Sequence, residues 1–204
     1  MTNPNTGDQS PRPLLDGVRI CAWNETLAAR LSEFRTIAYS KNIPAISNLS
    51  ASSLLLIDSW DSVSTHFLAE REGQLVGAIR LTSAVKSRLP LSAGYPSLGI
   101  QMQDLEVSRV VVDKEHRTGF VFLEMIRSLI SRCEGAEGRI LIDSCIGGMS
   151  NVRVDRYLMG GFSLQGLEFW DQRYNAPSKL LYIPRSEVSL QARMADAAFG
   201  NRLL

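Results

Sequence analysis

The sequence contains few of the residues that build metal sites, disulfide frameworks or nucleophile triads. Its 204 residues include three cysteines and two histidines. The cysteines form no C-x-x-C pair and no histidine cluster accompanies them, which argues against a zinc site and against a disulfide-stabilised fold. There is also no G-x-S-x-G element for a serine nucleophile. We therefore expect no metal. We expect Cys145 to line a pocket rather than attack a substrate, because buried cysteine is usually inert.

An excess of one charge is also missing, as are long apolar runs. Lys plus Arg number 22 and Asp plus Glu number 21, a net charge of +1, which argues against a general nucleic-acid binder. No apolar run approaches the roughly 18 residues of a membrane span, and the polar N-terminus lacks the layout of a signal peptide. We expect a cytoplasmic protein without a membrane span, in which residues 1–16 are a disordered tail and residues 17–204 form one domain.

The apolar residues follow helical and strand periods in turn, which predicts a mixed α/β (α+β) sheet with helices on its faces. Asn24 is a good helix N-cap, and Glu72-Gly73 is a turn dipeptide between two strands. The predicted elements are a strand at 18–23, a helix at 25–41, a hairpin at 65–83, a surface loop at 84–104, strands at 105–112 and 139–145 around a helix at 119–132, a short helix at 150–159, two closing strands and a C-terminal helix.

The central strand, turn and helix resemble a phosphate-binding unit with most of its glycines missing. The turn reads KEHRTGF and contains a single glycine. The start of the following helix, beside Arg117, is a candidate site for the pyrophosphate of coenzyme A. A plain charged turn is the alternative.

Glu106 and Arg109 interrupt the apolar strand that precedes this turn. In a regular strand, residues three apart point to opposite faces. A β-bulge between the two would bring both side chains to one face and turn backbone N–H groups toward a ligand. The strand continues as Val-Val-Val, which fits a buried strand better than a solvated edge. We therefore expect this pair to be functional.

Other charged residues occur in short motifs upstream. Asp58 and Asp61 would share a face of a helical turn, and Arg35 and Tyr39 lie one turn apart on the predicted helix. Arg80 follows three apolar positions and would need a carboxylate partner if buried. Each motif alone is more typical of a structural role than of catalysis.

Taken in order, these motifs resemble those of the acyl-homoserine-lactone synthases and of the related long-chain N-acyl amino acid synthases, two branches of the GNAT N-acyltransferase fold. The motifs are Arg35-x-x-x-Tyr39, Asp58-x-x-Asp61, Gly77-x-x-Arg80-Leu81 and Glu106-x-x-Arg109. The resemblance implies a mixed, mostly antiparallel, V-shaped sheet that splits beside the Glu106 strand. It also implies an acyl donor whose pantetheine arm lies in that split, and a charged network of Arg35, Asp58, Asp61, Arg80, Glu106 and Arg109 beside the amine pocket.

The resemblance further implies an acyl-carrier-protein thioester as donor, with acyl-CoA as the alternative and no tightly bound cofactor. Homoserine-lactone synthases usually have Phe at the position of Tyr39 and a tryptophan a few residues on, where this chain reads SKNIPA. This departure favours an amino acid or similar small amine as acceptor over S-adenosylmethionine. An autoinducer synthase, an acetyl-CoA-dependent acetyltransferase and an inactive binding domain are the other interpretations.

The expected chemistry is direct acyl transfer. Glu106 is the candidate base, positioned by Arg80 and Arg109, or it is held in ion pairs while water serves as the base. Backbone N–H groups near Val110 and Val111 would meet the oxyanion. The remaining candidates are Arg35, Tyr39, Asp58, Asp61, Ser144 and Cys145 for substrate binding, and Lys114, His116, Arg117, Arg153 and Arg156 for docking an acidic carrier protein.

Overall fold

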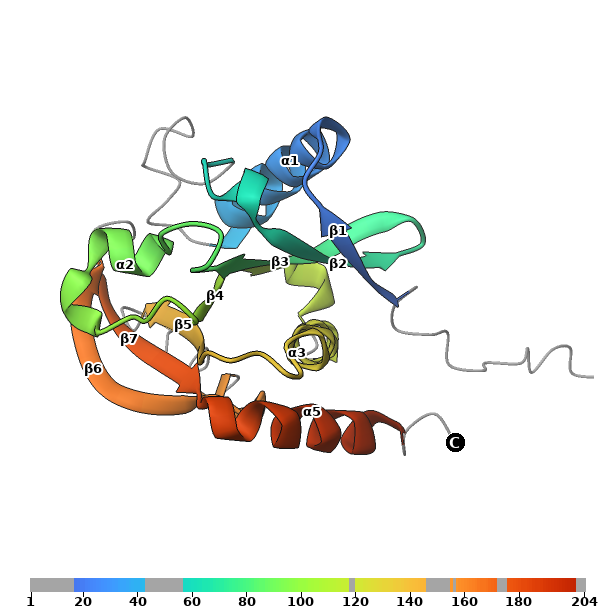
Figure 1. The fold of residues 1–204 in the computed structure, drawn as a ribbon. Coiled ribbons are helices and arrows are strands. Elements are labelled where there is room, and N and C mark those ends of the chain that lie inside the picture. Colours follow the sequence, from blue (N-terminus) through green and yellow to red (C-terminus); the bar gives the residue numbers. More distant parts are fainter. Residues whose placement is uncertain are drawn as a thin grey trace, which may run out of the picture.

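The computed structural model describes residues 17–42, 57–117, 120–145, 155, 157–171 and 176–200. Within these residues a single mixed sheet has seven strands in the order β1-β2-β3-β4-β5-β7-β6 (Figure 1). The strands are β1 (Gly17–Ala22), β2 (Thr65–Arg71), β3 (Gln74–Ser83), β4 (Leu105–Val112), β5 (Ile140–Cys145), β6 (Ser163–Asp171) and β7 (Ala176–Ile183). The helices are α1 (Glu25–Asn42), α2 (Pro90–Gly94), α3 (Phe120–Arg132) and α5 (Arg185–Gly200), with 3-10 turns η1 (Asp61–Val63), η2 (Pro96–Leu98) and η3 (Lys114–His116).

The first helix begins where its capping residue predicts. The Asn24 side chain accepts a hydrogen bond from the Leu27 N–H at 2.8 Å, which satisfies one of the N–H groups that a helix start leaves unpaired. Leu31 is fully buried, and the apolar stripe of α1 packs against strand residues that include Leu68 and Val111. The prediction of this helix is confirmed.

The predicted hairpin is also confirmed. Its two turn residues, Glu72 and Gly73, have φ angles of 52° and 74°, and Arg71 pairs with Gln74 across the turn. Two consecutive left-handed residues form the type of turn whose twist matches that of the flanking strands.

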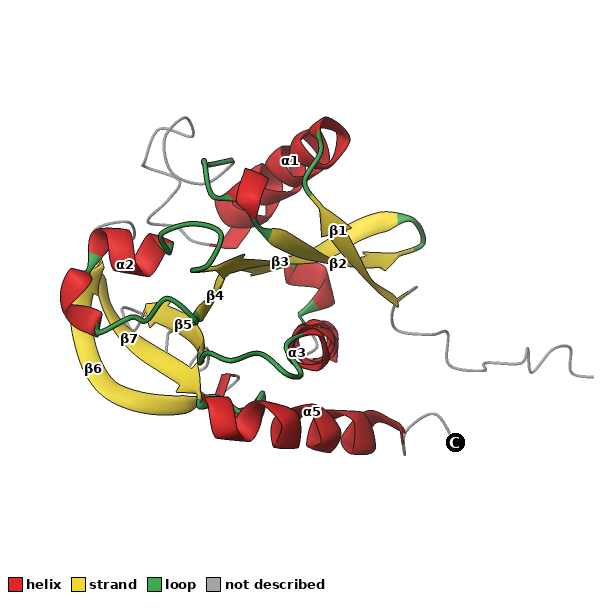
Figure 2. Cartoon of the chain, viewed as in Figure 1, coloured by secondary structure: helices red, strands yellow, loops and turns green. Residues whose placement is uncertain are grey.

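Helices cover both faces of the sheet. α3 and α5 lie on one face, and α1 and α2 lie on the other (Figure 2). The apolar face of α3 forms a core with the inward side chains of β2, β4, β5 and β7. Its members include Phe122, Met125, Ile126, Leu129, Ile140 and Ile142. None of the described helices is long and apolar enough to cross a membrane.

The segment between β3 and β4 is not the surface loop that the sequence predicts. It contains α2 and η2, and Leu89, Leu91 and Leu98 are buried there. Leu91 and Leu98 pack on Leu141 and Leu180. The prediction is wrong because these leucines follow no regular period in the sequence, so their burial depends on the sheet beneath them.

The two central strands pair over only part of their length. β4 and β5 are parallel, and their register runs from Leu105–Ile140 to Val107–Ile142. Beyond this point β4 continues to Val112 and β5 to Cys145, yet no further pair joins them. The sheet therefore opens here into the split that the resemblance implies, one residue after Glu106.

At the C-terminal end, the predicted closing strands and C-terminal helix are present. The short helix predicted at 150–159 lies mostly outside the described residues.

Candidate active site

A β-bulge is present in β4, but it lies at Arg109 and the residue after it rather than between Glu106 and Arg109, because the pairing with β3 is regular from Glu106 to Ser108. Ala78 pairs with Val111 whereas Arg80 pairs with Ser108, so β4 has one more residue than β3 across this interval. Arg109 lies in the bulge with a φ of 53°, a left-handed conformation that non-glycine residues rarely adopt. The bulge puts the Arg109 side chain on the same face as Arg80 and Ser108, where all three take part in one polar cluster.

The backbone directions around the bulge bear on the two predicted oxyanion donors. The Leu105 N–H donates to the carbonyl of Arg139, the residue before β5, and the Asp113 N–H donates to the Val76 carbonyl on β3. Peptide groups alternate between the two edges of a strand, so the N–H of Val111 points to β3 and that of Val110 points to the split. Val110 is therefore the preferred candidate for an oxyanion donor, and Val111, which pairs with Ala78, is the other.

Asp58 and Asp61 connect three arginines from three different elements. Arg80 contacts Asp58 at 2.5 Å and Asp61 at 3.4 Å, and Arg109 contacts Asp58 at 2.8 Å. Both terminal nitrogens of Arg35 lie 3.0 Å from Asp61 Oδ1. We call these five residues the ion network. It joins α1, β3 and β4 through the turn that precedes β2.

Burial gives this network its electrostatic character. Arg35 and Asp61 are both fully buried. Burial lowers the pKa of Arg35, and the neighbouring Asp61 opposes this. For Asp58, burial would raise the pKa, but Arg80 and Arg109 outweigh it and lower the value from 3.8 to about 2. Asp58 is therefore a carboxylate at neutral pH and a poor proton acceptor, which fits an organising role.

His66 lies on β2 beside the network. Its Nε2 is 3.0 Å from the Asp61 carbonyl oxygen, and its Nδ1 has no hydrogen-bond partner among the described residues. The side chain is fully buried, and this burial lowers its pKa. The imidazole is therefore neutral at pH 7.

Glu106 is fully buried at the root of the split. Its Oε2 accepts a hydrogen bond from the Leu91 N–H in α2 at 2.8 Å. The side-chain contacts described for Arg80 and Arg109 go to Asp58, Asp61 and Ser108. The two arginines thus lie on the face from which Glu106 also projects, and α2 covers the carboxylate.

The other residues proposed to bind substrate occupy different places. Tyr39 is buried in the cluster beneath α1. Ser144 is buried on β5 beyond the last β4 pair, and its hydroxyl has no hydrogen-bond partner among the described residues. Cys145 ends β5 at the open end of the split, and its side chain lies outside the described residues.

The proposed docking residues of the turn lie at the end of β4. Lys114 and His116 belong to η3, and Arg117 follows it. Arg117 Nε donates to the Val112 carbonyl at 3.1 Å, so this side chain occupies part of the open β4 edge. Arg153 and Arg156 lie outside the described residues.

Three polar groups of the site were missed by sequence reasoning. The Ser108 hydroxyl accepts from Arg80 Nε at 3.0 Å, and its place two residues after Glu106 on the same strand could have revealed it. The Leu91 N–H, which donates to Glu106, is a backbone group, so the residue type gives no sign of this contact. Trp60 lies inside the Asp58–Asp61 motif and donates from its indole nitrogen to the Arg88 carbonyl at 2.7 Å.

Comparison with known proteins supports the fold described above. The family model of the acetyltransferase (GNAT) domain matches residues 34–127, whereas no curated protein matches the sequence. A CoA-dependent acyl-homoserine lactone synthase, BjaI, solved with SAM and isopentyl-CoA, has a TM-score of 0.64 and 18% identity over 90% of this chain and 89% of that chain. The AHL synthase LasI has a TM-score of 0.61 and 15% identity over 85% and 93%.

FeeM, an N-acyl amino acid synthase from uncultured soil microbes, has a TM-score of 0.54 and 15% identity over 88% of this chain and 96% of that chain. Identities this low show the fold alone. The chain has the GNAT-like mixed fold, which confirms the predicted fold class, and its structural neighbours are those that the motifs suggest.

Proposed function

We propose that this chain transfers an acyl group from a thioester donor to the amine of an amino acid or a similar small amine. The observation that carries the proposal is the split between β4 and β5, which opens one residue beyond the buried Glu106 and is bordered by the bulge at Arg109. A thioester lying in this split would place its carbonyl near both a carboxylate and an outward N–H.

In the proposed mechanism Glu106 accepts a proton from the attacking amine. An α-ammonium group has a pKa near 8 and must lose a proton before it can attack. The amine then attacks the thioester carbonyl, and the Val110 N–H donates to the resulting oxyanion. The tetrahedral intermediate collapses with loss of the thiolate, which takes up the second proton from the nitrogen and leaves as a thiol, and Glu106 then releases the first proton to solvent. No covalent enzyme intermediate is required.

The ion network organises the site in this proposal. Asp58 holds Arg80 and Arg109 in place, and Arg109 in turn defines the bulge. Arg35 and Asp61 attach α1 to the same turn. Tyr39, Ser144 and Cys145 remain candidates for substrate binding, and Lys114, His116, Arg117, Arg153 and Arg156 remain candidates for docking the donor.

We propose an acyl carrier protein as the donor's carrier, because the turn after β4 has a single glycine and carries Lys114 and Arg117. Acyl-CoA is the second candidate, supported by the CoA dependence of BjaI. We propose an amino acid rather than S-adenosylmethionine as the acceptor, because this chain has Tyr39 and SKNIPA where homoserine-lactone synthases usually have Phe and a nearby tryptophan.

One experiment separates these possibilities. The full chain is incubated with an acyl carrier protein or CoA carrying the same acyl group, together with a panel of amino acids or S-adenosylmethionine, and the products are followed by mass. We expect N-acyl amino acids with the carrier-protein donor. Turnover with acetyl-CoA alone, or products only from S-adenosylmethionine, would contradict the proposal.

Replacing the proposed base tests the mechanism separately. Glu106→Gln keeps the shape of the side chain but cannot accept a proton, so kcat should fall by about 10²-fold or more. Glu168→Gln is the matched control and should leave kcat unchanged. Glu168 is exposed on the edge strand β6 and pairs with Lys179 of β7. Unchanged turnover of Glu106→Gln at saturating acceptor would remove Glu106 from the mechanism.

A further inference from the structure

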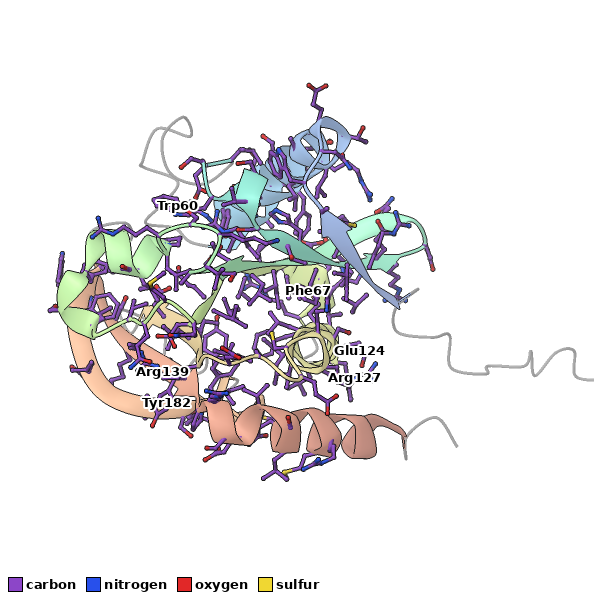
Figure 3. The ribbon with its side chains drawn as sticks, in the orientation of Figure 1. Trp60, Phe67, Glu124, Arg127, Arg139 and Tyr182 are labelled. Carbon is purple, nitrogen blue, oxygen red and sulfur yellow. The ribbon has the colours of Figure 1, made fainter. Side chains whose placement is uncertain are left out.

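Trp60 joins the turn that contains Asp58 and Asp61 to the loop that leads into α2, on the face of the sheet that α1 and α2 cover. Its backbone N–H donates to Asp58 Oδ1 at 2.9 Å, inside the ion network. Its indole N–H donates to the carbonyl of Arg88 at 2.7 Å, in the loop that leads into α2. Figure 3 labels Trp60 where these two segments meet. The residue therefore connects the ion network to a segment 28 residues away.

The segment that Trp60 holds also contacts Glu106. Arg88 lies two residues before Pro90, the first residue of α2. Leu91 follows, with a fully buried side chain and a backbone N–H bound to Glu106 Oε2 at 2.8 Å. The segment is thus attached at one end to Trp60 and in its first helical turn to the proposed base.

Such a short helix is not stable by itself. α2 has five residues, far below the length at which an isolated helix persists in water. Its conformation therefore depends on its contacts: the buried leucines beneath it, the Glu106 carboxylate and the Trp60 indole. Removal of the indole N–H would loosen the Arg88 end while leaving the leucines in place.

We propose that Trp60 is a positioning residue, which holds the segment 88–98 over Glu106 and thereby sets how the acceptor amine binds. The face of the sheet under α3 is filled by the main apolar core, so an acceptor reaches Glu106 from the face that α1 and α2 share. The segment 88–98 borders that route. The part of this inference that concerns the acceptor rests on the proposed function; the attachment of the segment does not.

Amide hydrogen exchange tests the attachment without any substrate. Trp60→Phe keeps an aromatic ring and removes the N–H donor. We expect peptides covering residues 88–98 to exchange at least about threefold faster in this variant, because loss of one hydrogen bond shifts a local opening equilibrium by about that factor or more. Trp170→Phe, at an exposed position on β6, is the matched control. Equal exchange in Trp60→Phe and the unmodified chain would overturn the proposal.

Kinetics test the consequence for the acceptor. Trp60→Phe should raise KM for the acceptor about fivefold, while kcat and KM for the donor stay within about twofold. An equal fall in kcat and kcat/KM, or a change confined to the donor, would overturn the positioning role. If the chain acylates no amine, the proposed function fails, but the exchange experiment still decides the attachment.

A measurement that needs no substitution at Trp60 guards against a variant that fails to fold. In Trp23→Phe/Trp170→Phe, Trp60 is the remaining tryptophan of the chain's three. Addition of the acceptor that supports turnover should change the intensity or wavelength of its emission. An emission that stays constant through saturation would overturn the proposal.

Discussion

Asp58→Asn should destabilise the protein by an amount that depends on pH. Asp58 binds Arg80 and Arg109 at 2.5 and 2.8 Å, which overcomes the effect of burial and lowers its pKa from 3.8 to about 2. At about 1.36 kcal/mol per pKa unit, this difference corresponds to about 2.5 kcal/mol of stability at pH 7. Because 22% of the side chain is exposed to solvent, we expect screening to reduce the pH-dependent part to about 1–2 kcal/mol.

The sign of the pH dependence follows from the lowered pKa. The stabilisation is complete above the pKa of the unfolded state and is lost as pH falls through the pKa of the folded state, so it disappears between about pH 5 and pH 2. At pH 3 about half should remain, since the unfolded chain has by then taken up most of its proton. The free energy of unfolding of Asp58→Asn and the unmodified chain should therefore converge as pH falls from 5 to 3.

Urea unfolding at pH 7, 5, 4 and 3 measures this difference directly. Asp155→Asn makes the same substitution at an exposed position and should change the free energy of unfolding by less than about 0.5 kcal/mol at every pH. A difference for Asp58→Asn that is the same at pH 7 and pH 3 would refute the reasoning, because it would mean that the charge of Asp58 contributes nothing to the folded state.

Two further predictions concern His66 and Gly138. Burial lowers the pKa of His66, so between pH 7 and pH 5 the unfolded chain binds a proton that the folded chain does not, and the free energy of unfolding falls as pH drops. His66→Gln should make the free energy of unfolding depend less on pH over this range. Urea unfolding measures it, and an unchanged pH dependence would contradict the lowered pKa of His66. A Cβ at Gly138 would lie 1.8 Å from the Gln103 carbonyl oxygen. Gly138→Ala should therefore lower the free energy of unfolding by about 2–3 kcal/mol. Gly135→Ala, with a φ of 83° and open space around the new atom, should cost about 1 kcal/mol, and equal losses in the two variants would refute the steric explanation.

The elements that the sequence predicts well depend on short-range signals. The 3-to-4 spacing of apolar residues and the Asn24 cap mark α1, and the Glu72-Gly73 dipeptide marks the hairpin. The presence of a bulge in β4 was also predictable, although its position was not, because two polar residues three apart in an apolar strand cannot share a face unless an extra residue is inserted. Each of these signals lies within one turn or one strand.

The parts of the site that were missed depend on contacts across long distances in the sequence. Leu91 reaches Glu106 across 15 residues and Trp60 reaches Arg88 across 28. Both contacts use a backbone group, so they cannot be predicted from the residue types. The burial of α2 likewise depends on the β5 and β7 side chains beneath it.

The sequence by itself determined the helix and strand periods, the presence of a bulge and the set of charged residues, because these properties are encoded by spacing along the chain. The tertiary structure alone decided which edge of β4 each N–H faces, which aspartate meets which arginine, and that α2 covers Glu106. These features follow from strand register and from the packing of distant segments, and a shift of one residue in either would reverse them.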